Sequence, residues 1–102
     1  MKLGVFSVLF QDKNFEEMLD YVAESGLDMI EIGTGGNPGD QFCKLDELLE
    51  SEEKRKEFKE AIDKRGLEIS AFSCHNNPIS PDPEKAKRSD DVLRKTIRLA
   101  NL

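Results

Sequence analysis

The sequence predicts an α/β protein made of three consecutive strand–helix units, the (βα)3 portion of a (β/α)8 barrel. Short β-prone runs alternate with amphipathic segments along the chain. In addition, residues 26–30 (GLDMI) and 66–70 (GLEIS) repeat one pattern, in which a glycine ends a helical segment and a β-prone run follows at once. Such alternation implies parallel strands joined by right-handed crossovers.

Three parallel strands are expected near residues 3–8, 29–32 and 69–73. The first apolar run follows a single basic residue, as it would in a signal peptide. However, the polar segment 11–13 comes next without a small-residue cleavage site, so we interpret the run as a strand.

Three helices are expected near residues 15–25, 51–65 and 83–101. Ser51 and Asp82 are suited to cap the second and third helices, and a proline suited to the first turn follows Asp82. The first two helices each carry an apolar face with helical spacing, formed by Phe15, Met18, Leu19, Val22 and Ala23 in the first and by Phe58, Ala61 and Ile62 in the second. The third helix continues through the apolar residues Val92, Leu93, Ile97 and Ala100.

The composition indicates one globular domain, residues 1–102, with 35% charged and 37% hydrophobic residues. No apolar run approaches the roughly 20 residues needed to cross a bilayer, so no membrane partner is expected. The net charge of −6 argues against a nucleic-acid partner. With two cysteines, Cys43 and Cys74, and no secretion signal, we expect reduced thiols and a cytoplasmic protein.

The expected loops after the strands, residues 33–50 and 74–82, are long, whereas the loops after the helices are short. Sites in parallel α/β folds are built at the C-terminal ends of the strands. Functional residues are therefore expected in these two loops and at the strand ends before them.

Glu31 lies between Ile30 and Ile32 in the second expected strand. If both isoleucines pack against helices, alternation turns the carboxylate to the opposite face, which lines the lumen of a barrel. A carboxylate there requires a cation, a substrate hydroxyl or a metal nearby. Glu31 either binds substrate or is tied to a Lys or Arg of another strand, and the sequence leaves both alternatives open.

His75 is the only histidine, and it lies at the end of the third expected strand, directly before Asn76 and Asn77. An imidazole at this position suits metal ligation, proton transfer or hydroxyl binding, and Asn76 adds an amide for substrate binding. The alternative is a packed or solvated histidine without a function.

Residues 33–39 (GTGGNPG) invite comparison with phosphate-binding loops, but they match none. Pro38 replaces the third glycine of the dinucleotide fingerprint, and the Gly-Lys-Ser/Thr of a P-loop is missing. The glycines more simply allow tight turns and close backbone approach. The alternative is a contact with a sugar or phosphate oxygen, with Thr34 as the substrate-binding side chain.

Three segments together resemble the N-terminal part of sugar phosphate isomerases/epimerases of the xylose-isomerase-like TIM-barrel superfamily: residues 1–7 (MKLGVFS), 26–36 (GLDMIEIGTGG) and 67–78 (LEISAFSCHNNP). The resemblance implies a divalent-metal barrel that interconverts ketoses and aldoses, or epimerises a carbon beside a carbonyl, through an enediolate. It implies Mn, Mg, Co or Zn as cofactor of the parent enzyme, and a sugar or sugar phosphate as its small-molecule partner.

The resemblance places Glu31 and His75 at strand ends that line the pocket, and His75 is similar to the first zinc-ligand histidine of endonuclease IV. The metal ligands and catalytic glutamates of the epimerases come mainly from later strands. We therefore assign no catalytic residue, and we expect this chain to be inactive and not to hold the metal alone.

Two alternatives to an isomerase or epimerase remain open. One is a structural or oligomerising barrel fragment without activity, and the other is an endonuclease IV-like phosphodiester hydrolase. Because three of eight strands leave open sheet edges and an uncovered inner face, we also expect self-association or association with the remainder of a barrel.

Overall fold

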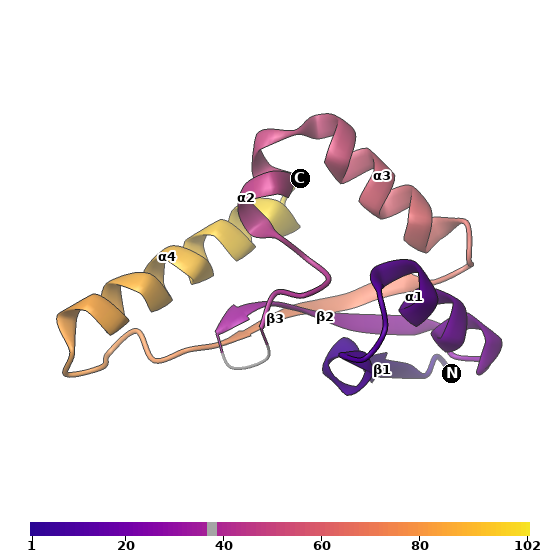
Figure 1. Cartoon of the computed structure of the whole chain (residues 1–102), viewed down its shortest axis with the longest axis horizontal. Helices are drawn as coiled ribbons and strands as arrows, with labels where there is room; N and C mark the ends of the chain where they lie inside the picture. The colour runs from indigo at the N-terminus through magenta and orange to yellow at the C-terminus, as the bar shows by residue number, and fades with distance from the viewer. Residues whose placement is uncertain (37–38) are drawn as a thin grey trace.

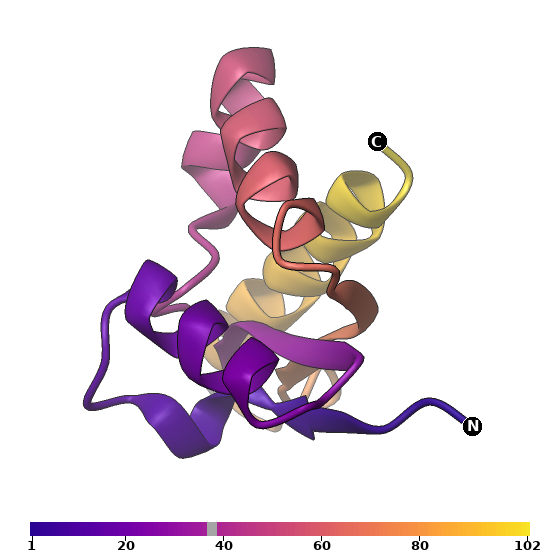
Figure 2. The same ribbon diagram turned by 90° about the vertical axis from the view of Figure 1, so that its right-hand side faces the viewer.

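The computed structural model describes residues 1–36 and 39–102. Its elements in chain order are β1 (Gly4–Phe6), the 3-10 helix η1 (Ser7–Phe10), α1 (Phe15–Glu24), β2 (Met29–Gly36), α2 (Leu45–Glu50), α3 (Glu52–Asp63), β3 (Glu68–His75) and α4 (Pro83–Ala100). The strands form one sheet in the order β1-β2-β3, and α1, α3 and α4 lie on one side of it (Figure 1, Figure 2).

Both strand pairs are parallel, which confirms the predicted α/β architecture of a partial barrel. Gly4 is in register with Met29, and Met29 is in register with Glu68. The two glycines of the repeated pattern, Gly26 and Gly66, have φ angles of 79° and 71°. This left-handed conformation ends each helix and returns the chain to the sheet, as the sequence predicts.

The extent of the strands differs from the prediction at their C-terminal ends. The prediction of a first strand through residue 8 is wrong, because β1 stops at Phe6 and a 3-10 turn begins at Ser7. The Ser7 hydroxyl oxygen there accepts a hydrogen bond from the Gly33 backbone N–H at 3.4 Å. Conversely, β2 continues to Gly36 and β3 to His75, because these two residues are still paired in register.

The three predicted helices form, and both predicted caps are confirmed. The Ser51 side chain accepts from the Lys54 backbone N–H at 3.2 Å, and the Asp82 side chain accepts from the Glu84 backbone N–H at 3.0 Å. The short helix α2 lies in the segment that the sequence predicts as loop. It has fewer than two full turns, so periodicity does not distinguish it from a loop.

The core lies between the helices and the facing side of the sheet. It is formed by buried apolar side chains of α1, β2, α2, α3 and α4 and of the segments before α2 and β3: Met18, Leu19, Val22, Ile30, Ile32, Phe42, Cys43, Leu45, Leu48, Ile62, Leu67 and Leu99. In the part of the chain that the structure describes, no helix is both long and apolar enough to cross a membrane.

Of the four apolar residues named for the third helix, Val92 packs against the core. Leu93, Ile97 and Ala100 are exposed, Ile97 by 60%, whereas Thr96 and Leu99 are buried. Thr96 faces the sheet on the same side of α4 as the core residue Leu99, and its hydroxyl lies 2.9 Å from the Thr34 hydroxyl on β2 and donates to the Val92 backbone carbonyl at 2.8 Å.

The two cysteines are free thiols in different surroundings. Cys43 is only 1% exposed, and burial, with a smaller contribution from the charge of Asp40, raises its pKa to about 12. Its thiolate therefore forms only near pH 12, so at pH 8 its thiolate fraction is on the order of a thousandfold below that of an ordinary thiol.

We expect a short pulse of iodoacetamide at pH 8 to modify Cys74, which is partly exposed, well before Cys43. Peptide mass spectrometry of the quenched reaction measures both sites. In urea, where burial is lost, the two cysteines should react at similar rates. Equal labelling in the folded protein would contradict the burial of Cys43.

Candidate functional site

The candidate site lies on the sheet face opposite the helices, from the first half of β2 to the end of β3. Ile30 and Ile32 are both fully buried on the helix side, which confirms the predicted orientation of Glu31. Because side chains alternate along a strand, the Glu31 carboxylate projects from the other face. In a closed barrel this face lines the lumen.

Ser73 on β3 provides the hydrogen-bond partner of Glu31. The Ser73 hydroxyl donates to the Glu31 Oε2, and Ser73 itself is buried. The sequence leaves open a structural tie of Glu31 to Lys or Arg, but within the described residues no cation pairs with Glu31. A carboxylate has about four acceptor positions, so Glu31 can accept further hydrogen bonds.

His75 is the last residue of β3, and its ring is exposed to solvent. It packs edge-on against the Phe6 ring of β1, with ring centroids 6.5 Å apart and an interplanar angle of 62°. Phe6 is in register with Glu31, and Ser73 precedes His75 by two positions. Phe6, Glu31, Ser73 and His75 therefore belong to one face of the sheet, along which His75 lies farthest toward the C-terminal ends of the strands.

Asn76 follows β3 and lies against the backbone of Gly36. A Cβ atom added to Gly36 would stand 2.0 Å from the Asn76 Oδ1, so the Asn76 side chain would have to move, and the φ of 68° at Gly36 also favours glycine. Among the described residues, the buried Nδ2 of Asn76 finds no hydrogen-bond partner. An unsatisfied buried donor is uncommon in a folded protein and marks Asn76 as a candidate for ligand binding.

Thr34 is not brought together with the other predicted site residues. It is 1% exposed and follows Ile30 and Ile32 on the helix side of β2. Its hydroxyl lies within hydrogen-bond distance of the Ser73 backbone carbonyl, at 3.3 Å, and of the Thr96 hydroxyl. In this position Thr34 connects β2 to β3 and to α4, which is a structural role.

A family model for the xylose isomerase-like TIM barrel matches residues 19–102. The chain belongs to this family. It is also 41% identical over 102 residues to the uncharacterized protein YfiH of Bacillus subtilis (strain 168). The alignment includes 100% of this chain and 32% of YfiH, so the chain spans about a third of the length of this relative.

In xylose isomerase-like barrels, as in other barrels of parallel strands, the functional face is the C-terminal end of the strands. Ser73, His75 and Asn76 lie toward that end of β3, whereas Glu31 is the third of the eight residues of β2 and is level with Phe6, the last residue of β1. Within the described residues, however, no three His, Cys, Asp or Glu side chains come together as a metal site. His75 is a candidate ligand, but the residues described here do not form a metal site by themselves.

Sequence reasoning missed two residues of this face, Ser73 and Phe6. Alternation counted from Ile69 would have placed Ser73 and His75 on the helix side, and the register shift between the Ile30–Ile69 and Glu31–Ala71 pairs is what places them on the face of Glu31. No local signal identifies Phe6, because its contact with His75 joins the first and third strands.

Proposed function

We propose that this chain forms part of an isomerase or epimerase that moves a proton beside the carbonyl of a sugar or sugar phosphate through an enediolate. The observation that carries the proposal is the Glu31 carboxylate, which projects from the open face of a xylose isomerase-like sheet with a single hydroxyl partner. Such a carboxylate is suited to bind a sugar hydroxyl.

Each residue of the face has a role in this proposal. Glu31 accepts a hydrogen bond from a substrate hydroxyl, and the Ser73 hydroxyl holds the carboxylate in place. His75, steadied by Phe6, orients the substrate. A divalent metal (Mn, Mg, Co or Zn) belongs to the proposal only together with ligands from other strands, with His75 as the candidate ligand of this chain.

Proton transfer through an enediolate predicts exchange with solvent at the carbon beside the carbonyl. The test incubates aldoses, ketoses and their phosphates in D2O with Mn²⁺, Mg²⁺, Co²⁺ or Zn²⁺ and follows deuterium incorporation by mass spectrometry. The catalyst is either the purified chain or a chimera of YfiH in which this chain replaces the matching segment. Exchange by the chimera but not by the chain supports the proposal. If unmodified YfiH catalyses exchange and the chimera does not do so with any of the sugars, the proposal is contradicted.

Self-association is a separate part of the proposal. In the described three-stranded sheet, β1 and β3 each have an unpaired edge, and Leu93, Ile97 and Leu102 are exposed apolar side chains. Open edges and apolar patches favour pairing with another chain. We expect sedimentation velocity at micromolar concentration to show dimers or larger species, and a sharp monomer boundary would contradict this.

The location that we propose for the protein is the cytoplasm. Cys43 and Cys74 are not bonded to each other, which is compatible with a reducing compartment. Fractionation of the source cells, followed by detection of the protein, tests this part of the proposal.

A further inference from the structure

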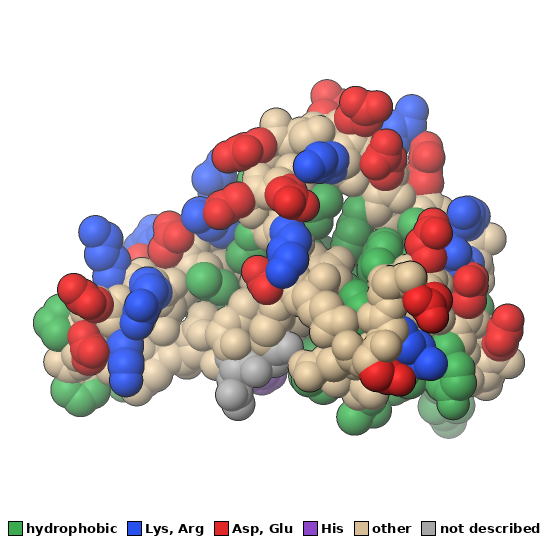
Figure 3. Space-filling model, viewed as in Figure 1, with side chains coloured by type: hydrophobic (Ala, Val, Ile, Leu, Met, Phe, Trp, Pro, Cys, Tyr) green, Lys and Arg blue, Asp and Glu red, His purple; other side chains and the backbone are tan. Residues whose placement is uncertain are grey.

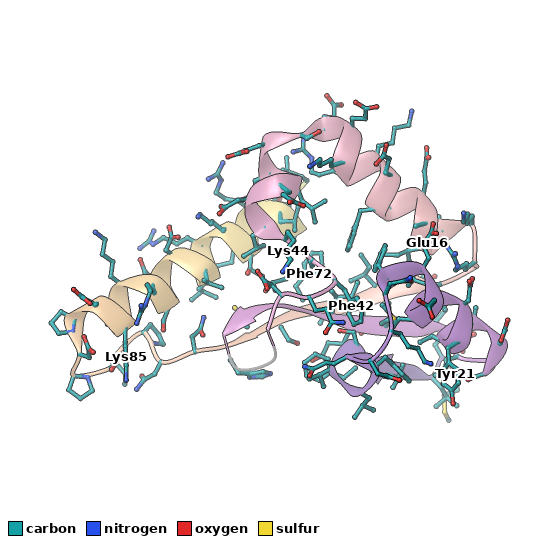
Figure 4. All side chains as sticks on the ribbon, in the orientation of Figure 1. Glu16, Tyr21, Phe42, Lys44, Phe72 and Lys85 are labelled. Carbon is teal, nitrogen blue, oxygen red and sulfur yellow. The ribbon has the colours of Figure 1, made fainter. Side chains whose placement is uncertain are left out.

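A cleft separates the end of β3 from the first half of α4, and we call it the β3–α4 cleft. Its lining includes His75, Asn76, Asn77, Lys85 and Arg88. No Asp or Glu is part of this lining, although the chain as a whole carries a net charge of −6. Figure 4 shows Lys85 on α4 beside the segment that leads from β3 to this helix.

Lys85 and Arg88 are three residues apart on α4 and therefore lie on one face of the helix. Neither forms an ion pair within the described part of the chain. Farther along the same helix, Arg94 pairs with Asp90 at 2.7 Å and Lys95 pairs with Asp46 at 2.7 Å. Lys85 and Arg88 are thus the charged side chains of the cleft lining, whereas the acidic side chains of this half of α4 do not line it. Basic and acidic side chains are both visible over this half in Figure 3.

The asparagines add hydrogen-bond donors to this positive charge. The Asn76 Nδ2 is buried and has no acceptor among the described residues. The Asn77 Oδ1 accepts from the Ile79 backbone N–H at 3.2 Å, so its amide group still has donors to offer. Both asparagines line the cleft, and leaving a buried donor unsatisfied is costly.

We propose that the β3–α4 cleft binds an anionic group of the substrate, a phosphate ester or a carboxylate. The inference rests on the proposed function and narrows its substrates to anionic sugars. His75 connects the two regions, because it lines the cleft and lies two residues beyond Ser73, the partner of Glu31. The anionic group lies between Lys85 and Arg88, and the rest of the sugar extends toward Glu31.

A nucleic-acid strand is a poorer match for the same cleft. Proteins that bind nucleic acid neutralise several successive phosphates, and their binding surfaces are basic over a wide area. Here two Lys or Arg side chains face the cleft, and acidic residues dominate the chain. Two basic side chains fit one phosphate or carboxylate group.

The test measures binding, so it does not depend on turnover. The probes are inorganic phosphate, a hexose 6-phosphate, a hexuronic acid and the neutral hexose, each titrated into the 15N-labelled chain and followed by NMR. We expect the two sugar anions to bind more tightly than the neutral hexose, with shifts centred on Asn76, Lys85 and Arg88. Tighter binding of the phosphate ester than of the uronic acid assigns the cleft to phosphate, and the reverse order assigns it to carboxylate.

The double variant Lys85→Gln/Arg88→Gln should raise the dissociation constant for the preferred anion about tenfold or more. Lys87→Gln is the matched control, because Lys87 lies on the same helix and does not line the cleft. An equal loss in the control, or equal binding of neutral and anionic sugars, would overturn the proposal, as would tighter binding of an abasic DNA duplex than of every sugar anion. If anions bind as expected but no sugar exchanges deuterium, only the proposed reaction fails.

Discussion

Replacing Ile32 by alanine is expected to lower the free energy of unfolding by about 3 kcal/mol. Ile32 lies on the central strand β2, is 0% exposed and belongs to the main core. Truncation removes its buried methyl groups and leaves a cavity between the sheet and the helices. Since small domains are stable by only about 5–15 kcal/mol, such a loss is a large share of the total.

Urea unfolding followed by circular dichroism measures this effect, at a fixed protein concentration because self-association would contribute to stability. Ile79→Ala is the matched control, since Ile79 is 88% exposed in the loop before α4. We expect the control to change stability by less than about 0.5 kcal/mol. Similar effects of the two variants would show that the helix side of β2 is not the core.

Replacing Glu31 by glutamine should lower the rate of deuterium exchange by about 10- to 100-fold in the active chimera. Glutamine keeps the size of the side chain but removes the negative charge. A hydrogen bond to a charged group contributes about 1.5–3 kcal/mol, and each 1.4 kcal/mol corresponds to a factor of ten in rate. Ser73→Ala should have a smaller effect, because Ser73 acts by holding Glu31.

Glu68→Gln is the control for this experiment. Glu68 begins β3 at the end of the sheet away from the site and forms an exposed ion pair with Lys2 at 2.7 Å. We expect the chimera with Glu68→Gln to exchange deuterium at the same rate as the unmodified chimera. If Glu31→Gln leaves the rate unchanged as well, the carboxylate has only a structural role and does not bind the substrate.

The direction of Glu31 could be predicted because it depends only on its two neighbours. The isoleucines that flank it, Ile30 and Ile32, define which face of the strand is buried, and alternation places the Glu31 side chain on the opposite face. The hydroxyl partner could not be predicted in the same way. Ser73 lies 42 positions farther along the chain, and its distance from Glu31 follows from the register between β2 and β3.

The lengths of β2 and β3 were underestimated for a related reason. Residues 33–36 have no apolar side chain, so their composition indicates a loop. Main-chain pairing with β3 nevertheless continues there, since backbone hydrogen bonds need no side chain. The expectation that Thr34 binds substrate assumed that it lies in a loop. In a strand, the side chain of a residue is fixed on one face of the sheet, and that of Thr34 lies on the helix side.

The buried side of α4 could not be predicted from its apolar residues alone. Leu93 and Ile97 are exposed, whereas the structure buries Thr96, whose hydroxyl meets the Thr34 hydroxyl 62 positions away in the chain. A buried polar pair of this kind is satisfied across elements. Scales that rank single side chains by hydropathy do not register such a pair.

The two glycines that end β2 limit how this protein can evolve. A methyl group on Gly35 would lie 2.9 Å from Val92 of α4, and one on Gly36 would overlap Asn76. Every substitution at these positions adds atoms where none can be accommodated without movement. A saturation library should therefore tolerate fewer amino acids at Gly35 and Gly36 than at exposed charged positions, although neither glycine contributes a side chain to the site.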